Sequence, residues 1–555
     1  MTATSSNVTC VEGERRSLLA IKHKIIDRFN LLSTWSGVEC CEWRGVGCDS
    51  RNGHVVKLDL RSPVRLEDLY YKWLEGELSP CFQNLKHLRY LDLSMNNFSG
   101  KIPEYLAPIV DDLRWVSSLS SLRYLDLSGI SIGNHTHWFH PVNMLPSLLT
   151  LNLVFTGITN IPSTQFVNFT TLVILDISRN MFSGPIPASL GLFSKLKKLD
   201  VSRNSLDGVL FETHFTNLKN LIHLDLSSNW LALNFSSRWI PPFQLQIFRA
   251  SFCSNIGSYF PNWLHTQTHL QWLDLSNSSI RDTIPQWFES ILSHILYLDL
   301  SNNQIGGKMP LFHFDSSDQI FYKILLLNSN KFEGTLAAFP SNVTHLDLSD
   351  NLLSGDLPQT VGTMNLSLYV VNLSKNRFTG NIPVDLCKVP SIEVLDLSQN
   401  KLSGRLPECL GNLSNLEAMD LSNNIIKGHV PSSLGSLAQL KSLHLQNNRF
   451  EGNLPQSLQN LTRLVTMDIG YNLLVGDIPF WIGENVLELR ILNLAQNNII
   501  LRGTMDSAGR HYQGVAKETI RHMNMLVKLK LKMKMKTFGF MLAWAQVSFL
   551  DLWDY

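Results

Sequence analysis

The chain has 555 residues with 44% hydrophobic content, and 47 basic residues nearly balance 46 acidic ones, giving a net charge of +1. This composition indicates a folded chain and excludes a largely disordered one, while the small net charge provides no whole-chain field that would attract nucleic acid or an anionic membrane. Length alone predicts three or four compact domains. A strict internal repeat overrides that expectation, because a solenoid grows without a closing core.

Residues 1–54 are predicted to form an N-terminal cap, and they hold four of the eight cysteines: Cys10, Cys40, Cys41 and Cys48. The sequon N-x-S/T occurs at Asn7, Asn97, Asn134, Asn168, Asn234, Asn277, Asn342, Asn365, Asn372, Asn412 and Asn460. Clustered cysteines and many sequons together favour secretion into an oxidising compartment and predict glycosylation. The opening MTATSSNVTC has neither a basic nor an apolar leader region, so the sequence shows no clear signal peptide.

Residues 55–503 repeat the pattern L-x-x-L-x-L-x-x-N-x-L-x-G-x-I-P about 18 times, mostly at steps of 24 or 25 residues. The short L-x-L run predicts a strand whose leucines face inward and whose intervening residues face outward. One unit cannot bury its leucine face alone, so neighbouring units stack and share a long core. The expected fold is an α/β-type solenoid with a concave parallel β-sheet.

The asparagine of the pattern is predicted to form a ladder, because an amide can donate to and accept from backbone groups inside the turn that follows each strand. Thirteen of the 18 copies have it, from Asn96 to Asn497. Thr156, Cys253 and Ser278 replace it with small side chains, which favours a ladder role for Cys253 over a reactive thiol. Pro63 and Ile130 interrupt it.

An aspartate separates the two strand leucines in twelve copies: Asp59, Asp92, Asp126, Asp176, Asp200, Asp225, Asp274, Asp299, Asp347, Asp396, Asp420 and Asp468. A column of carboxylates invites a catalytic or metal-binding interpretation, and neighbours at strand spacing should raise one another's pKa. Because the residue recurs in twelve of the 18 copies, whereas a catalytic pair would be local, we expect a structural role and neither a metal nor a cofactor. Asn152, Arg249, Leu326, Asn372, His444 and Asn493 are the exceptions.

Aromatic and basic residues at the variable strand positions are the candidate ligand-binding residues. They are Tyr90, Tyr124, Phe155, Arg249, Trp272, Tyr297, His444 and Tyr471, with Phe252 at an equivalent position and Arg89, Arg123, Lys197, Lys198, Arg179 and Arg203 beside them. Large aromatics and arginine are favoured at binding hot spots. The alternative is a set of scattered surface aromatics under glycan. His444 is either an ordinary exposed histidine or a ligand contact and pH sensor.

Cys387 and Cys409 fall about one repeat apart, so stacked turns could bring them within disulfide reach; the alternative is two buried thiols. Cys81 and Cys253 have no evident disulfide partners.

Residues 504–555 form an atypical basic and apolar tail. Its apolar stretch 538–550 is shorter than the roughly 20 residues of a membrane span. The run 528–536 alternates lysine with apolar residues, which would suit an anionic membrane or mark a non-native end.

The repeat and the head CVEGERRSLLAIKHKIIDRFNLLSTWSGVECCEWRGVGCD resemble plant-specific extracellular leucine-rich repeats with their N-terminal cap. That resemblance implies a right-handed superhelix and the cap disulfides Cys10–Cys40 and Cys41–Cys48. Irregular segments such as RWIPPFQLQIF (238–248) and FPNWLHTQTHLQWLDLSNSSIRDTIPQWF (260–288) are similar to receptor-like proteins of the ethylene-inducing-xylanase receptor type. Those are immune receptors of the plasma membrane that lack a kinase.

The resemblance implies an extracellular recognition ectodomain, not an enzyme, that binds a peptide or protein ligand and takes part in defence or development. Full-length members signal through adaptor and co-receptor kinases, whose binding region is largely missing here. One alternative is a soluble inhibitor of a cell-wall-degrading hydrolase, similar to the polygalacturonase-inhibiting proteins. Another is a glycan-processing enzyme that uses the aspartate column. No nucleic-acid partner is expected.

Overall fold

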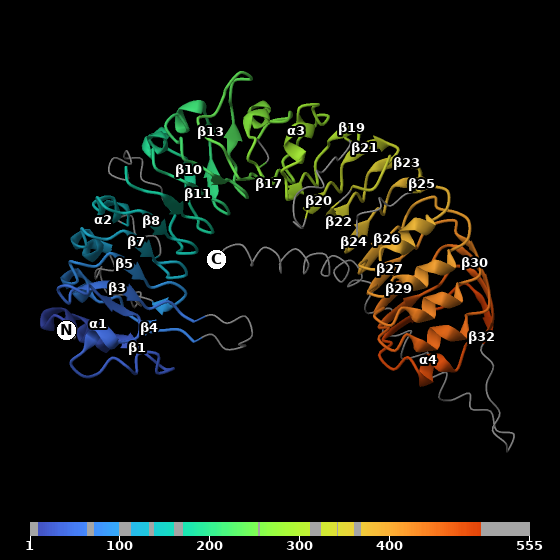
Figure 1. Cartoon of the computed structure of the whole chain (residues 1–555), viewed down its shortest axis with the longest axis horizontal. Helices are drawn as coiled ribbons and strands as arrows, with labels where there is room; N and C mark the ends of the chain where they lie inside the picture. Colours follow the sequence, from blue (N-terminus) through green and yellow to red (C-terminus); the bar gives the residue numbers. More distant parts are fainter. Residues whose placement is uncertain are drawn as a thin grey trace, which may run out of the picture. The chain divides into compact units, whose positions relative to one another are not determined.

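A computed structural model describes residues 9–63, 72–98, 113–132, 138–159, 170–253, 256–310, 323–340, 342–359 and 368–500. The chain divides into two units, Met1–Asp315 and Ser316–Tyr555, which are described separately (Figure 1). Both units contain repeats. The predicted tail features at 528–536 and 538–550 lie outside the described residues, as do the sequons at Asn7, Asn134, Asn168 and Asn365.

The first unit begins with the cap. Its main element is helix α1 (Glu12–Lys24), which buries Leu18 and Ile21 and has acidic residues in its first turn and basic ones in its last, the distribution that the helix dipole favours. Trp35 and Trp43 stack beside it with ring centroids 5.5 Å apart. The cap also contains β1 (Ile25–Ile26), the 3₁₀ helix η1 (Cys40–Glu42) and β2 (Val46–Cys48). Strand β2 pairs antiparallel with the first repeat strand.

Ten repeat strands follow in the described part of the first unit and pair in parallel, in chain order, along one sheet. They are β3 (Val55–Asp59), β5 (Tyr90–Asp92), β7 (Tyr124–Asp126), β8 (Thr150–Asn152), β9 (Ile174–Asp176), β11 (Lys198–Asp200), β14 (His223–Asp225), β16 (Ile247–Arg249), β17 (Trp272–Asp274) and β18 (Tyr297–Asp299). The register never slips between them: each central leucine or phenylalanine faces its counterpart on the next strand.

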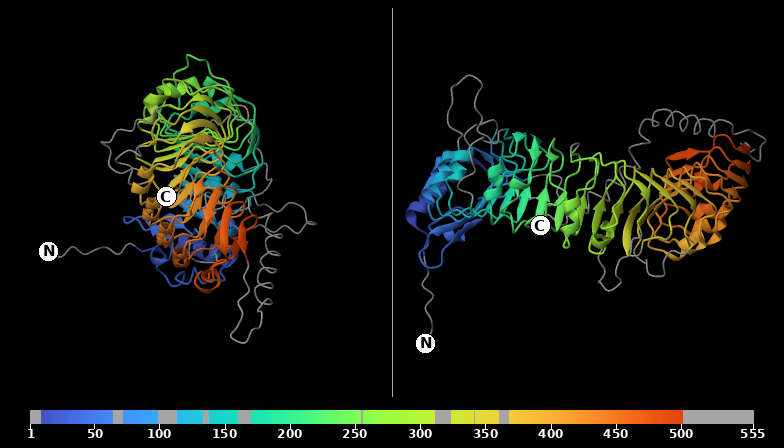
Figure 2. Two further views of the ribbon diagram at one scale, coloured as in Figure 1. Left: turned by 90° about the vertical axis from the view of Figure 1, so that its right-hand side faces the viewer. Right: turned by 90° about the horizontal axis from the view of Figure 1, so that it is seen from above.

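The described part of the second unit has eight repeat strands in the same arrangement. They are β20 (Lys323–Leu326), β22 (Val343–Asp347), β24 (Val370–Asn372), β26 (Val394–Asp396), β27 (Ala418–Asp420), β29 (Ser442–His444), β31 (Thr466–Asp468) and β33 (Ile491–Asn493). Within each unit the strands lie next to one another and line its inner side (Figures 1 and 2). The predicted solenoid with a long parallel sheet is confirmed.

Short helices and strands close the outer side of each repeat. The first unit has α2 (Phe139–Asn143), α3 (Phe288–Leu292), η2 (Pro80–Asn84), η3 (Leu113–Ser118), η4 (Ala188–Leu192), η5 (Glu212–His214), η6 (Asn262–Thr266), β4 (Glu75–Gly76), β6 (Asn97–Phe98), β10 (Ser183–Pro185), β12 (Ser205–Asp207), β13 (Val209–Leu210), β15 (Ala232–Leu233) and β19 (Gly306–Lys308). The second has α4 (Trp481–Glu484), η7 (Val384–Lys388), η8 (Glu408–Asn412), η9 (Ser432–Ser436), η10 (Gln456–Asn460), β21 (Lys331–Gly334), β23 (Leu352–Asp356), β25 (Arg377–Thr379), β28 (Lys427–Gly428), β30 (Arg449–Gly452), β32 (Leu473–Asp477) and β34 (Asn498–Ile500).

The asparagine ladder satisfies the turn that follows each strand. Asn400 is typical: its Nδ2 donates to the carbonyl oxygens of Leu373, Leu397 and Ser398 at 3.0, 3.2 and 3.1 Å. Its Oδ1 accepts the amide of Phe378 at 3.0 Å. The bond to Leu373 crosses to the neighbouring repeat, so each amide also ties two rungs together. Buried Cys253 holds the same place, and its thiol donates to the carbonyl of Leu226 at 3.2 Å, as the ladder interpretation expects.

Candidate functional site

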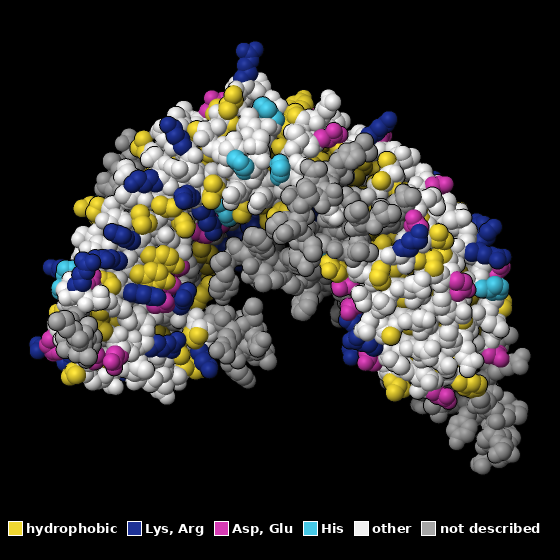
Figure 3. Space-filling model, in the orientation of Figure 1, with side chains coloured by type: hydrophobic (Ala, Val, Ile, Leu, Met, Phe, Trp, Pro, Cys, Tyr) yellow, Lys and Arg dark blue, Asp and Glu magenta, His cyan; other side chains and the backbone are white. Residues whose placement is uncertain are grey.

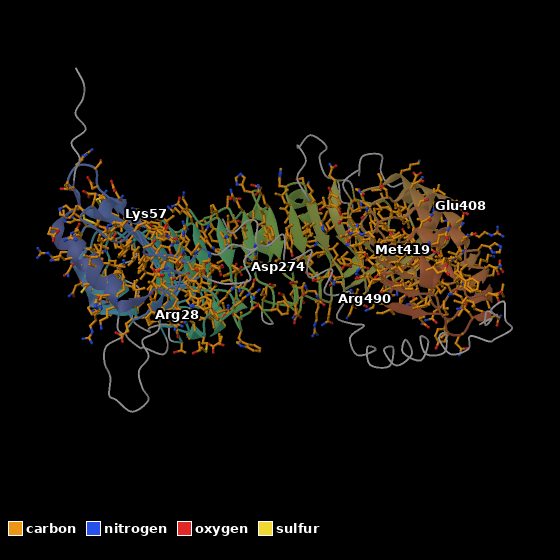
Figure 4. The ribbon with its side chains drawn as sticks, turned by 90° about the horizontal axis from the view of Figure 1, so that it is seen from below. Arg28, Lys57, Asp274, Glu408, Met419 and Arg490 are labelled. Carbon is orange, nitrogen blue, oxygen red and sulfur yellow. A yellow bond between two sulfur atoms is a disulfide. The ribbon has the colours of Figure 1, made fainter. Side chains whose placement is uncertain are left out.

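The first candidate cluster lies on β3, β5 and β7. Tyr90 and Tyr124 occupy the same register position on neighbouring strands, and their rings stack with centroids 4.3 Å apart at an interplanar angle of 9°. The Nζ atom of Lys57 lies 4.9 Å from the centroid of the Tyr90 ring, which is within cation–π range. We call Lys57, Tyr90 and Tyr124 the tyrosine stack. Figure 4 shows Lys57 over the strands of the first unit.

The second cluster lies on β16, β17 and β18. Trp272 and Tyr297 share a register position and stack with centroids 4.0 Å apart at 10°. The guanidinium of Arg249 lies 4.6 Å from the centroid of the Trp272 ring, and its Nη1 is 3.6 Å from Asp225 Oδ2. We call Arg249, Trp272 and Tyr297 the tryptophan stack. It repeats the design of the tyrosine stack, with a cation against the first of two aromatic rings.

Each tyrosine is held by the aspartate two residues further along its strand. The hydroxyls of Tyr90 and Tyr124 donate to Asp92 and Asp126 at 3.1 and 3.2 Å, and that of Tyr297 donates to Asp299 at 3.4 Å. Burial, followed by the charge of Asp92, raises the pKa of Tyr90 to about 12, and burial also raises the pKa of Tyr124 and of Tyr297. The hydroxyls therefore stay protonated, and the half-buried rings are fixed before any ligand arrives.

The aspartate column has a structural role in the described residues. One carboxylate oxygen accepts the backbone amide of the serine two positions on, at 3.0 Å for Asp92 and Ser94 and at 2.9 Å for Asp396 and Ser398. This bond closes the turn that leads into the ladder. The side chains are buried, and burial together with neighbouring carboxylates raises the pKa of Asp396 to about 6. The same contact recurs along the sheet, so the geometry supports a scaffold.

The asparagines that interrupt the column relieve its repulsion. Asn152 Nδ2 donates to Asp126 at 2.9 Å. In the second unit, Asn372 and Asn493 donate to Asp347 and Asp468 at 3.1 and 2.8 Å. An amide has the shape of a carboxylate but can donate a hydrogen bond to the next rung. These exceptions are therefore part of the scaffold. Among the sequence exceptions in the first unit, Arg249 differs because it joins the tryptophan stack.

Two groups of ionisable side chains in the first unit resemble metal sites in composition. Asp200, His223 and Asp225 offer ligand atoms within 4.8 Å of one another. Burial and the flanking carboxylates raise the pKa of Asp200 to about 8, while burial, Lys198 and Arg249 lower the pKa of His223 to about 3. Nearby cations and a protonated carboxyl do not suit a metal ion. The second group, Glu14, His54 and His87, is already committed, because Glu14 accepts the amide of Val55 at 2.7 Å and ties the cap to β3.

The remaining predicted ligand-binding residues lie apart from both stacks. Phe155, Phe252 and Tyr471 follow their strands at φ near +55°, where 70%, 59% and 54% of their surfaces are exposed. His444 is half-buried on β29 of the second unit, with Nε2 2.9 Å from Ser442 Oγ. The sequence prediction missed Lys57. Lys57 could have been found from the sequence, because it is a basic residue at the same variable strand position as the tyrosines.

Basic side chains are prominent on the exposed face of the first unit, where dark-blue groups gather with fewer acidic ones among them (Figure 3). Arg89, Arg123, Arg179 and Arg203 are all exposed. Arg179 and Arg203 hold equivalent positions on successive rungs, since their amides donate to Ser202 and Ser227 in turn. Exposed arginines therefore accompany the ordered aromatic rings in this unit.

The structure has the disulfides Cys10–Cys40, Cys41–Cys48 and Cys387–Cys409, whose Cα atoms are 5.5, 5.5 and 5.6 Å apart. Cys81 and Cys253 are free thiols. Six predicted sequon asparagines are at least partly exposed: Asn97, Asn234, Asn277, Asn342, Asn412 and Asn460. Asn372 is buried and donates to Asp347. The prediction of a glycan at Asn372 is therefore wrong for the folded chain, because its amide is part of the column.

No helix within the described residues is long and apolar enough to cross a membrane.

Family models match a leucine rich repeat N-terminal domain at residues 11–49 and leucine rich repeats at 146–206 and 366–426. A further repeat model matches four shorter segments. Receptor-like protein EIX2 of Solanum lycopersicum is 28% identical over 69% of this chain and 61% of its own length. Receptor-like protein EIX1 of the same plant is 27% identical over 60% of this chain and 56% of its own.

Two solved structures are similar in fold. The Arabidopsis receptor kinase HAESA, in complex with the peptide hormone IDA and the co-receptor SERK1, has a TM-score of 0.67 at 26% identity and covers 88% of this chain and 86% of its own. The ectodomain of the receptor kinase GASSHO1/SCHENGEN3 from Arabidopsis thaliana, in complex with CASPARIAN STRIP INTEGRITY FACTOR 2, has a TM-score of 0.64 at 27% identity. It covers 87% of this chain and 62% of its own.

Proposed function

We propose, from the premise that the chain is a leucine-rich-repeat protein of the plant receptor-like type, that it is an extracellular recognition ectodomain. It binds a peptide or protein ligand on the strand face that carries the tyrosine and tryptophan stacks. The chain spans about three-fifths of the length of the receptor-like proteins that it matches. The signalling role is therefore also part of the proposal: the chain belongs to an immune or developmental receptor at the plasma membrane.

The observation that carries the proposal is the pair of cation-capped aromatic stacks. The scaffold does not need them, because small side chains such as Ala418 and Ser442 hold the same register position in the second unit. Aromatic rings and arginine bury much area per ordered bond and are favoured at hot spots. Rings that are fixed in advance also lower the entropy cost of binding. Strand pairing does not require the two stacked aromatic pairs, whereas ligand binding would use them.

A co-receptor partner is part of the proposal. The HAESA structure contains both a peptide hormone and the co-receptor SERK1, and its fold covers most of this chain. By likeness, a receptor kinase or adaptor would join the ligand-bound chain to pass on the signal. The proposal is non-enzymatic, because the aspartates that could supply catalytic carboxylates are engaged by serine amides.

The test is ligand capture by the immobilised chain from plant extracellular fluid and microbial culture filtrates, followed by titration of the purified ligand. The variant Trp272→Ala with Tyr297→Ala should weaken binding about 100-fold, the loss expected of two hot-spot rings. Tyr259→Ala is the matched control, since this tyrosine is 74% exposed and lies outside both stacks. Equal affinity of both variants for the captured ligand would contradict the proposal. Inhibition of a polygalacturonase by the intact chain would instead favour the hydrolase-inhibitor alternative.

A further inference from the structure

An open pocket of about 420 Å³ lies at the edge of the first unit's sheet, just before strands β11, β14, β16 and β17 begin. An irregular connection contributes about half of its lining. Helix η5 precedes β14 and helix η6 precedes β17, but the described connection between β15 and β16 has no helix. This connection contains the segment RWIPPFQLQIF. Pro241, Pro242, Phe243, Gln244 and Gln246 of this connection line the hollow, which we call the edge pocket.

The floor of the edge pocket is a ladder of residues in register. The carbonyl of Lys197 accepts the amides of Ile222 and His223 at 2.9 and 3.0 Å. The carbonyl of Ile222 accepts the amide of Gln246 at 2.8 Å. Lys197, Ile222 and Gln246 therefore present their side chains from successive rungs of a rigid sheet. Rigid elements hold binding groups more accurately than loops do.

The wall of the pocket is fixed as well. Pro241 and Pro242 restrict the backbone, and the buried side chain of Phe243 anchors it against Trp239 and Trp263, with centroids 6.2 and 6.3 Å away. The side chain of Gln244 then ties this wall to the next repeat, because its Nε2 donates to the carbonyl of Thr266 at 2.9 Å. The pocket is preformed, which reduces the ordering cost of a ligand.

The lining is positively charged. Its charge comes from Lys197 and Lys219, and it contains no aspartate or glutamate. Within the described residues neither lysine is in an ion pair, and both are exposed at the rim. On the neighbouring strands Lys198 and Arg249 are already paired with Asp176 and Asp225, at 3.0 and 3.6 Å. Gln246 adds an exposed amide, and Ile222 with Pro242 adds apolar surface beside the charges.

We propose that the edge pocket binds a carboxylate-bearing segment of the peptide ligand, with Lys197 and Lys219 as its charged contacts and Gln246 as a neutral hydrogen-bond donor. The inference rests on the proposed function and specifies an acidic peptide as the ligand class. Continuity with the tryptophan stack supports a peptide, because the carbonyl of Gln246 accepts the amides of Gln271 and Trp272 at 2.9 and 3.0 Å. A chain that crosses the Trp272 ring would reach the pocket within a few residues.

The probe is a labelled, end-blocked hexapeptide with two glutamates, measured by fluorescence anisotropy at low salt against its glutamine counterpart. The intact chain should bind the glutamate peptide with a Kd of about 1 mM or tighter. The double variant Lys197→Gln with Lys219→Gln should raise that Kd about tenfold or more, since charge-assisted contacts are the strong ones. The control Lys86→Gln with Lys308→Gln removes the same charge from exposed positions of the same unit outside the pocket and should leave binding unchanged.

Equal weakening by the two double variants would overturn the proposal, since it would show only a general charge effect. Preference for trigalacturonic acid or for inorganic sulfate over the glutamate peptide would overturn the ligand class. Failure here is distinguishable from failure of the proposed function. If a captured natural ligand loses affinity with Trp272→Ala and Tyr297→Ala but not with the Lys197 and Lys219 variant, the strand face stands as the binding surface and the edge pocket does not.

Discussion

The two units use one scaffold and differ in what that scaffold presents. Both have the same strand register, the same asparagine ladder and the same aspartate-to-serine bond. At one strand position the first unit has Tyr90, Tyr124, Trp272 and Tyr297 among smaller side chains such as Thr150 and Ile174, whereas the second has His345 together with Val370, Val394, Ala418, Ser442 and Thr466. The preceding position is basic at Arg89, Arg123 and Lys197 in the first unit, whereas the second unit has two acidic residues there, Glu393 and Glu417, as well as the basic Lys441 and Arg490.

This contrast separates what folding requires from what it leaves open. Regular repeats with nearly constant connections build the second unit, whereas the first unit has uneven connections, two aromatic stacks and the edge pocket. The pairing register is the same with tryptophan at position 272 and with alanine at position 418, so the register does not require the larger side chain. The predictions below test whether the units differ in this way.

The largest effect is expected where the scaffold is broken. Asn424→Ala in the second unit would leave the carbonyls of Leu397, Leu421 and Ser422 without their donor and the amide of Leu402 without its acceptor. Several orphaned buried groups should cost about 4 kcal/mol of the free energy of unfolding. Urea unfolding followed by tryptophan fluorescence would measure it. Lys401→Ala, at an exposed position of the same unit, should change stability little, and equal losses in both variants would refute the ladder.

The next effect concerns the disulfide that joins η7 and η8. Replacing Cys387 and Cys409 with alanine releases a link across 22 residues, which should cost about 3 kcal/mol through the greater freedom of the unfolded chain. The loss should fall on the second unit. Limited proteolysis would locate it, with new cuts near 387–409 and none near the tryptophan stack. Weaker ligand binding in this variant would contradict the division of roles between the units.

Much of this scaffold could be predicted from the sequence, because its residues recur. The leucine spacing predicted the strands, and the recurring asparagine predicted the ladder to which Asn400 belongs. Singular features were harder. Lys57 pairs with Tyr90 only because strands 33 residues apart in the chain lie side by side, and the edge pocket is lined by residues from several successive rungs. Glycan prediction failed at Asn372 because the sequon is a local rule, whereas burial depends on the neighbouring rung.

A pH effect should distinguish the units more finely. The carboxyl of Asp200 has a pKa raised to about 8 in the folded chain, against 3.8 otherwise. Its contribution to stability is therefore complete at low pH and is lost as the pH rises through about 8. Asp396 in the second unit has a pKa of about 6, so its contribution is mostly lost before neutrality. The lowered pKa of His223 makes stability rise with pH, but only below the ordinary histidine pKa of 6.5.

Between pH 6.5 and 8.5 the melting temperature should therefore fall, and Asp200→Asn should flatten that fall by a few degrees. Asp396→Asn is the matched control and should leave the slope in this window unchanged. Differential scanning calorimetry at intervals of pH would measure both. A slope that both substitutions flatten equally would mean that the carboxyls of the two units titrate alike, against the assignment made here.

The smallest effect separates the role of the Tyr90 hydroxyl from the role of its ring. Tyr90→Phe removes the hydrogen bond to Asp92 but keeps the ring against Tyr124, so the free energy of unfolding should fall by about 1 kcal/mol or less. Ligand affinity should fall less than in Tyr90→Ala, because the phenyl ring still offers its apolar surface and still lies under Lys57. Titration of the captured ligand with both variants would decide it. If phenylalanine proved as harmful as alanine, the hydroxyl would be the recognised group, and recognition at this stack would depend on hydrogen bonding rather than on the ring.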